Sequence, residues 1–116
     1  MAIEVRPVTN DKELADFIDL PWKIYKGYKY WVPPLKKEVM EMVSIHHYPF
    51  WQHAERELYV AYDGGNIVGR IAAITDQNHD KVHEEKAGFF GFFESMPDYE
   101  IADKLFKVAK EWGKQK

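Results

Sequence analysis

Two histidines spaced four residues apart, His79 and His83, are the first candidates for chemistry, because Asp80, Glu84 and Glu85 stand beside them. On a helix this spacing would place both imidazoles on one face, where they could bind a zinc ion. The polar segment around them is typical of a loop, and the sequence offers no third ligand at a suitable spacing. We therefore expect a solvated loop here and no metal site.

The candidates for proton transfer are two glutamates and the histidines: Glu57, Glu94, His46, His47, His53, His79 and His83. A general base must lie within hydrogen-bonding reach of the proton that it removes, and the sequence defines no cleft that would hold that proton. The catalytic residues therefore stay unknown. Arg70 stands in the middle of an expected strand, where we expect a structural role, either facing outward or pairing with an acid such as Glu94.

The most distinctive stretch is GFFGFFES, Gly88 to Ser95, in which each of two phenylalanine pairs follows a glycine. Strict alternation along a strand would place Phe89, Gly91 and Phe93 on one face and Phe90 and Phe92 on the other. Aromatic side chains on both faces predict a central strand that is covered on both sides. Glycine weakens a strand, so Gly88 and Gly91 indicate either a ligand that approaches closely or a bulge and aromatic packing.

Aromatic residues are also concentrated in two segments before the expected sheet: Trp22, Tyr25, Tyr28, Tyr30 and Trp31 in the first, and Tyr48, Phe50 and Trp51 in the second. Packing over the sheet is one interpretation, and a substrate wall or partner surface is another. Lysines alternate with the aromatic residues from Trp22 to Trp31, but the net charge of −3 argues against nucleic acid as the ligand.

Length and composition describe one folded domain of 116 residues, with 46% hydrophobic and 16% aromatic residues. The chain has no cysteine, which excludes disulfides, thiolate metal sites and a cysteine nucleophile. The charged N-terminus lacks the apolar stretch of a signal peptide, and no apolar run approaches the ~20 residues of a membrane span. We expect a cytoplasmic protein that binds neither nucleic acid nor membrane.

The periodicity of the hydrophobic residues predicts the elements in the order β-α-α-β-β-β-α. The expected elements are a strand over 3–8, a helix capped by Asn10 and Glu13 that Pro21 ends or kinks, a helix opened by Pro33 and Pro34, strands over 57–62, 67–75 and 88–93, and a helix over about 98–114. The last helix has one apolar stripe, formed by Ile101, Leu105, Val108, Ala109 and Trp112, and we expect it to pack on the sheet through Ile101, Leu105 and Trp112. Asp63, Gly64, Gly65 and Asn66 provide the turn of a hairpin between the second and third strands. The fold class is thus α+β, an antiparallel sheet of about four strands with helices on its faces.

VGRIAAITDQNH, GFFGFFES and the final KEWGK together resemble the first half of a GNAT acyltransferase-superfamily domain. The resemblance covers Ile3 to Gly113 and implies a single GNAT-like domain over 1–116 that lacks the family's last strands and helix. It also implies the N-terminal part of an acyl-CoA-dependent N-acyltransferase, inactive as this chain alone. The alternative is a non-catalytic interaction or ligand-binding module with the same fold.

The resemblance places acetyl-CoA or another acyl-CoA along the last strand, at Phe90, Gly91, Phe92, Phe93 and Ser95. The family's pyrophosphate loop supplies glycine amides and a basic side chain, whereas residues 94–100 read ESMPDYE. We therefore expect this chain alone to bind acetyl-CoA no more tightly than ~1 mM. The strands that the family adds beyond this point are absent, so the edge of the last strand needs a cover. We expect a homodimer, the missing C-terminal half, or a loop or the last helix of this chain to cover it.

Overall fold

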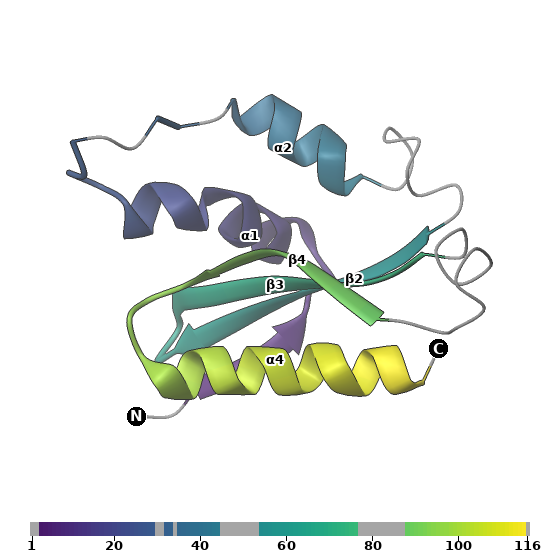
Figure 1. Ribbon diagram of the computed structural model, residues 1–116. Coiled ribbons are helices and arrows are strands. Elements are labelled where there is room, and N and C mark those ends of the chain that lie inside the picture. Colours follow the sequence, from purple (N-terminus) through teal and green to yellow (C-terminus); the bar gives the residue numbers. More distant parts are fainter. Residues whose placement is uncertain (1–2, 30–31, 34, 45–53, 77–87, 116) are drawn as a thin grey trace.

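The computed structural model describes residues 3–29, 32–33, 35–44, 54–76 and 88–115 (Figure 1). Its elements follow the predicted order: β1 (Ile3–Pro7), α1 (Asp11–Ile24), α2 (Lys36–Val43), β2 (Ala54–Asp63), β3 (Asn66–Asp76), β4 (Gly88–Ser95) and α4 (Tyr99–Lys114). The predicted α+β class is confirmed. Among the described helices, none is both long enough and apolar enough to cross a membrane.

The four strands form one antiparallel sheet in the order β1-β2-β3-β4. The predicted hairpin between β2 and β3 is confirmed, and its turn has Gly64 and Gly65 at φ values of 58° and 86°. Glycine adopts this left-handed conformation without the steric cost of a side chain, so the turn sequence determines the pairing. β4, however, lies at an edge of the described sheet, and the prediction of a central strand is wrong.

Helices lie on both sides of the sheet, α1 and α2 on one side and α4 on the other (Figure 1). The core accordingly has two parts. The cluster on the α1 side consists of Phe17, Ile18, Val39, Val43, Leu58, Val60, Tyr62 and Ala72, and the cluster on the α4 side consists of Ile3, Ala61, Ile71, Ile101 and Leu105. Successive side chains of a strand point to opposite faces of the sheet, so the strands contribute residues to both clusters.

α4 approaches the sheet closely at Gly69 in β3. A Cβ atom at this position would lie 2.8 Å from both Ile101 Cγ2 and Leu105 Cδ1, so a side chain there would displace the helix or its side chains. Ile101 and Leu105 are buried, as the apolar stripe of the helix predicts. The lack of a side chain at Gly69 thus allows α4 to pack closely against β3.

The first helix begins as predicted, with the Asn10 side chain accepting a hydrogen bond from the Glu13 amide at 2.8 Å. The Glu13 carboxylate in turn accepts from the amide and the hydroxyl of Thr9, both at 2.9 Å. These bonds from Thr9 hold the pKa of Glu13 below its ordinary value. Burial acts in the opposite direction on Asp16, but hydrogen bonds from Tyr62 and Lys12 keep the pKa of that carboxyl lowered as well.

We expect acid to destabilise the protein through these two carboxylates. Their folded-state pKa values lie below the unfolded values of 4.5 and 3.8, so the stabilisation is present above those values and is lost as the pH falls through the folded pKa values. Urea unfolding from pH 7 down to pH 2 measures the loss. Tyr62→Phe removes one of the bonds that Asp16 accepts and should make the pH dependence shallower, whereas an unchanged slope would contradict this assignment.

Candidate functional site

A buried arginine joins α1, β3 and β4. Arg70 of β3 is only 6% exposed, and its guanidinium donates from Nη1 to the carbonyl oxygen of Phe17 at 2.6 Å and from Nε to that of Phe92 at 2.8 Å. Its Cζ atom also lies 4.9 Å from the ring centroid of Phe17 and 5.9 Å from that of Phe92. Burial lowers the pKa of Arg70 to about 10, and the guanidinium stays charged at neutral pH.

The acceptor in α1 is available because of a proline. In an α-helix the amide at position 21 would donate to the carbonyl of Phe17, four residues earlier, but Pro21 has no N–H group. The expectation that Pro21 ends or kinks the helix is wrong about the ending, because α1 continues to Ile24 and the Tyr25 amide donates to Pro21 O at 2.9 Å. Arg70 therefore replaces a missing helical hydrogen bond from outside the helix.

The acceptor in β4 lies in a β-bulge. Gly91 is opposite Ala72 and Glu94 is opposite Arg70, so Phe92 and Phe93 together face the single residue Ile71. Phe92 has a φ of 55°, the left-handed conformation that costs a residue with a side chain about 1–3 kcal/mol. The bulge turns the Phe92 carbonyl to Arg70, so the buried cation and the unusual backbone depend on each other.

The bulge also corrects the predicted alternation of side chains. Gly91 lies beside Ile74, and the ring of Phe92 lies 6.3 Å from that of Phe17, so both face the α1 side. Phe90 and Phe93 face α4, where their ring centroids lie 5.0 and 4.7 Å from that of Phe106. The predicted sharing of a face by Gly91 and Phe93 is wrong because the extra residue reverses the alternation.

The five residues predicted to contact an acyl-CoA therefore do not form one surface. Gly91 and Phe92 face α1, Phe90 and Phe93 face α4, and Ser95 donates its hydroxyl hydrogen bond to the Met96 carbonyl at 2.7 Å. Phe90 is 56% exposed at the edge of the described sheet. Their contact with a cofactor stays a prediction, as does the expected weak binding of acetyl-CoA.

The start of α4 carries its own anion. The Asp98 side chain caps the helix by accepting a hydrogen bond from the Glu100 amide at 2.9 Å. A bound phosphate would need these same N-terminal amides, and it would meet the charge of Asp98 there. The sequence predicted acidic residues at the start of this helix. The structure shows that one of them, Asp98, accepts a hydrogen bond from a main-chain amide of the first turn.

A second polar contact lies beside Arg70. The Tyr25 hydroxyl donates to a Glu94 carboxylate oxygen at 2.7 Å, and this bond, with burial, raises the pKa of Tyr25. Glu94 favours the charged form of Arg70, which agrees with the predicted pairing, although the direct hydrogen-bond partners of Arg70 are main-chain carbonyls. Its predicted structural role is consistent with these contacts, and the outward-facing alternative is wrong.

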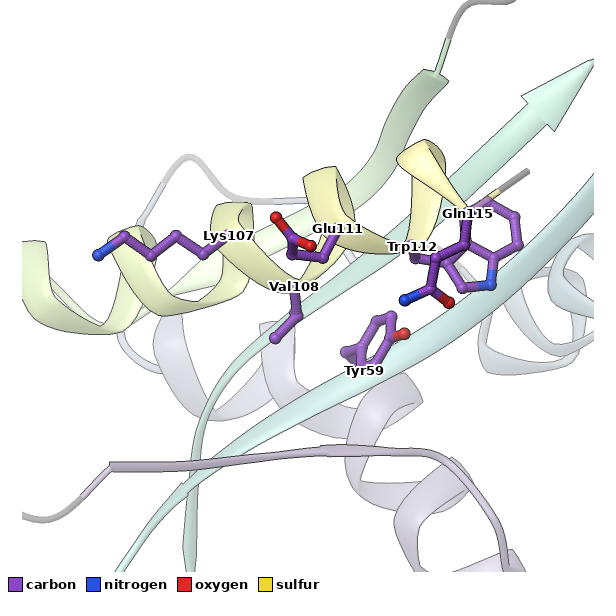
Figure 2. Close-up of a pocket in the computed structure, with 6 residues that line it drawn as sticks. All are labelled: Tyr59, Lys107, Val108, Glu111, Trp112 and Gln115. Atoms are coloured by element: carbon purple, nitrogen blue, oxygen red, sulfur yellow. The ribbon is translucent and has the colours of Figure 1, made fainter.

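Two neighbouring cavities lie between α4 and the strands β1 and β2. One, of about 260 Å³, is lined by Tyr59, Lys107, Val108, Glu111, Trp112 and Gln115 (Figure 2). The other, of about 240 Å³, is lined by Ile3, Val5, Lys104, Lys107 and Val108. The sequence did not indicate these cavities. Val108 and Trp112 belong to the predicted apolar stripe of α4, which indicated core packing, whereas both side chains are half-buried.

Several predicted candidates lie outside the described residues. These are the possible metal ligands His79 and His83, the further proton-transfer candidates His46, His47 and His53, and Tyr30, Trp31, Tyr48, Phe50 and Trp51 of the aromatic segments. Within the described parts of the chain, no three His, Cys, Asp or Glu side chains are grouped so that they could hold a metal ion. Of the described aromatic residues in the first segment, Tyr28 is exposed and Trp22 and Tyr25 are half-buried.

Sequence comparison finds two curated proteins that match nearly all of this chain. The chain is 34% identical over 111 residues to a protein of Caulobacter vibrioides named "Bacterial ceramide synthase", covering 95% of this chain and 29% of that protein. It is also 34% identical over 110 residues to "Protein YghO" of Escherichia coli, covering 95% of this chain and 28% of that protein. This chain thus spans less than a third of the length of either relative.

No family model matches the chain, and no solved structure matches it. These comparisons correct the resemblance to the GNAT superfamily: the matching proteins are named a ceramide synthase and YghO. The assignment to a GNAT-like, acyl-CoA-dependent N-acyltransferase and the alternative of a GNAT-fold binding module are therefore wrong. The motifs behind that assignment have packing roles here, because Gly69 admits α4, Arg70 joins α1 to β4, and Ala72 and Ala73 are fully buried.

Proposed function

We propose that this chain is a segment of a ceramide-forming protein. The observation that carries the proposal is the 34% identity to the Caulobacter ceramide synthase, which extends over 95% of this chain. A ceramide contains long hydrocarbon chains, and the apolar cavities between α4 and the strands are the part of the described structure that suits such a chain. The compartment that we expect is the cytoplasm, and the expected partner is a second copy or further segments of the same protein.

A chimera tests this proposal. The matching 111-residue stretch of the Caulobacter protein is replaced by this chain, and the chimera is expressed in Caulobacter cells that lack their own ceramide synthase. We expect ceramide to reappear in lipid extracts examined by mass spectrometry, because an equivalent segment should preserve both the fold and the substrate contacts.

Two controls make this experiment decisive. The intact Caulobacter protein, expressed in the same cells, shows that the strain can form ceramide. Immunoblotting and a thermal unfolding transition show that the chimera accumulates in a folded state. A folded chimera that produces no ceramide beside an active intact protein would contradict the proposed function.

A further inference from the structure

We propose that the cavities between α4 and the strands β1 and β2 form one groove that binds a long-chain fatty acid. This inference rests on the proposed function and names a substrate class for it. The two cavities share Lys107 and Val108 in their linings, so they adjoin each other along α4. Each cavity is smaller than the ~300 Å³ at which ligand pockets usually begin, whereas the two together suit an elongated ligand.

The lining of the groove is mostly apolar. Ile3 and Val5 come from β1, Tyr59 comes from β2, and Val108 and Trp112 come from α4. Figure 2 shows Val108 and Trp112 on the side of α4 that faces the Tyr59 ring, with the Gln115 side chain beside them. Burial raises the pKa of Tyr59, with a further contribution from Glu57, so the phenol stays neutral at physiological pH. A hydrocarbon chain is the ligand that this lining suits.

The charges at the β1 end indicate which head group accompanies the chain. Lys104 and Lys107 are the charged residues that line the cavity against Ile3 and Val5, and none of the described residues that line it is acidic. Lys104 donates to the Ile3 carbonyl at 3.3 Å, and Lys107 lies 3.0 Å from Asp103. A lysine ammonium has three donors, so both can also bind a carboxylate. The two cations favour a fatty acid over a long-chain amine.

The end of the groove at Tyr59 and Trp112 has different polar groups from the β1 end. Glu111 is the acidic residue among the described residues that line the larger cavity, and its carboxylate lies 3.7 Å from Lys114. Gln115 and the Tyr59 hydroxyl are the neutral polar groups there. We therefore orient the ligand with its carboxylate at Lys104 and Lys107 and its hydrocarbon tail toward Tyr59 and Trp112.

Palmitate and octanoate, added below their micellar concentrations to the 116-residue chain, test the groove. Two-dimensional NMR should show saturable shifts for the amides of Tyr59 and Val108 and for the Trp112 indole. Palmitate should bind more tightly than octanoate, because each fully buried methylene strengthens binding by about fourfold. Equal affinities, or shifts centred on other residues, would overturn the proposal.

Matched variants locate the binding. Val108→Glu places a charge in the groove and should weaken palmitate binding by at least about tenfold. Tyr99→Glu makes the same charge change on the same helix at a residue that is 84% exposed, and it should leave binding unchanged. If Val108→Glu does not fold, Lys107→Glu provides the second test at an exposed position, and it should weaken binding of palmitate. Equal effects of the groove and control variants would overturn the proposal.

Two further measurements separate the alternatives. If sphingosine binds at these residues more tightly than palmitate, the groove takes an amine and the proposed fatty acid is wrong. If ultracentrifugation shows a dimer that Val108→Glu dissociates and that palmitate does not affect, the groove is a contact between copies and the proposal is overturned. An active chimera without palmitate binding would overturn this inference alone, whereas palmitate binding with an inactive chimera would overturn the proposed function alone.

Discussion

Replacing Arg70 by methionine should lower the free energy of unfolding by about 2–5 kcal/mol. The substitution keeps much of the side-chain volume, but it leaves the carbonyl oxygens of Phe17 and Phe92 without the donors that now satisfy them. A buried carbonyl without a partner costs about 1–3 kcal/mol. Replacing a buried ion pair with apolar residues can be neutral, but here the acceptors belong to the main chain and remain. Urea denaturation followed by circular dichroism measures the loss.

A second substitution separates the two acceptors. Pro21→Ala restores a backbone amide that can donate to Phe17 O within the helix. In the Arg70→Met background, Pro21→Ala should therefore recover about 1 kcal/mol more than it does in the wild-type background. Asp19→Ala at an exposed position of α1 is the control, and its effect should be the same in both backgrounds. Equal effects of Pro21→Ala in the two backgrounds would contradict the assigned role of Arg70.

Local patterns predicted most of the elements. The hairpin turn required two residues with positive φ, and Gly64 and Gly65 provide them. The N-terminus of α1 required a side-chain acceptor, and Asn10 provides it. The α4 stripe correctly gave Ile101 and Leu105 as buried residues. In each case the residues that determine the structure are close together in the sequence, so a short window contains the information.

The features that the sequence did not predict depend on residues far apart in the chain. In α1, Arg70 of β3 donates to the Phe17 carbonyl that Pro21 leaves without a helical donor, and in β4 the bulge opposite Ile71 reverses the alternation of side chains. Phenylalanine pairs on both faces indicated a central strand, but Phe17 and Phe106 can contact the two faces of an edge strand equally well. No local pattern distinguishes these cases, because strand order is a property of the assembled sheet.

The candidate groove, too, could not be predicted from local sequence patterns. Val108 and Trp112 have the spacing of core residues on an amphipathic helix, and spacing alone does not show which residues of the stripe are fully buried and which line a cavity. The excess of lysines on α4 at positions 104 and 107 was the available signal. These lysines indicate a binding site only together with the structure, which places both of them against Ile3 and Val5 of β1.

Replacing Leu105 by alanine should cost about 2–5 kcal/mol, because this fully buried side chain packs α4 on the sheet. Gly69→Ala should cost about 1–3 kcal/mol by overpacking, since its Cβ would lie 2.8 Å from Leu105 Cδ1 and from Ile101 Cγ2. The double variant should lose less than the sum, because Leu105→Ala removes one of these two atoms. Gly69→Ala combined with Leu58→Ala, in the cluster on the α1 side, should be additive. If the losses of unfolding free energy from Gly69→Ala and Leu105→Ala are additive, α4 moves away from the sheet instead of repacking on it.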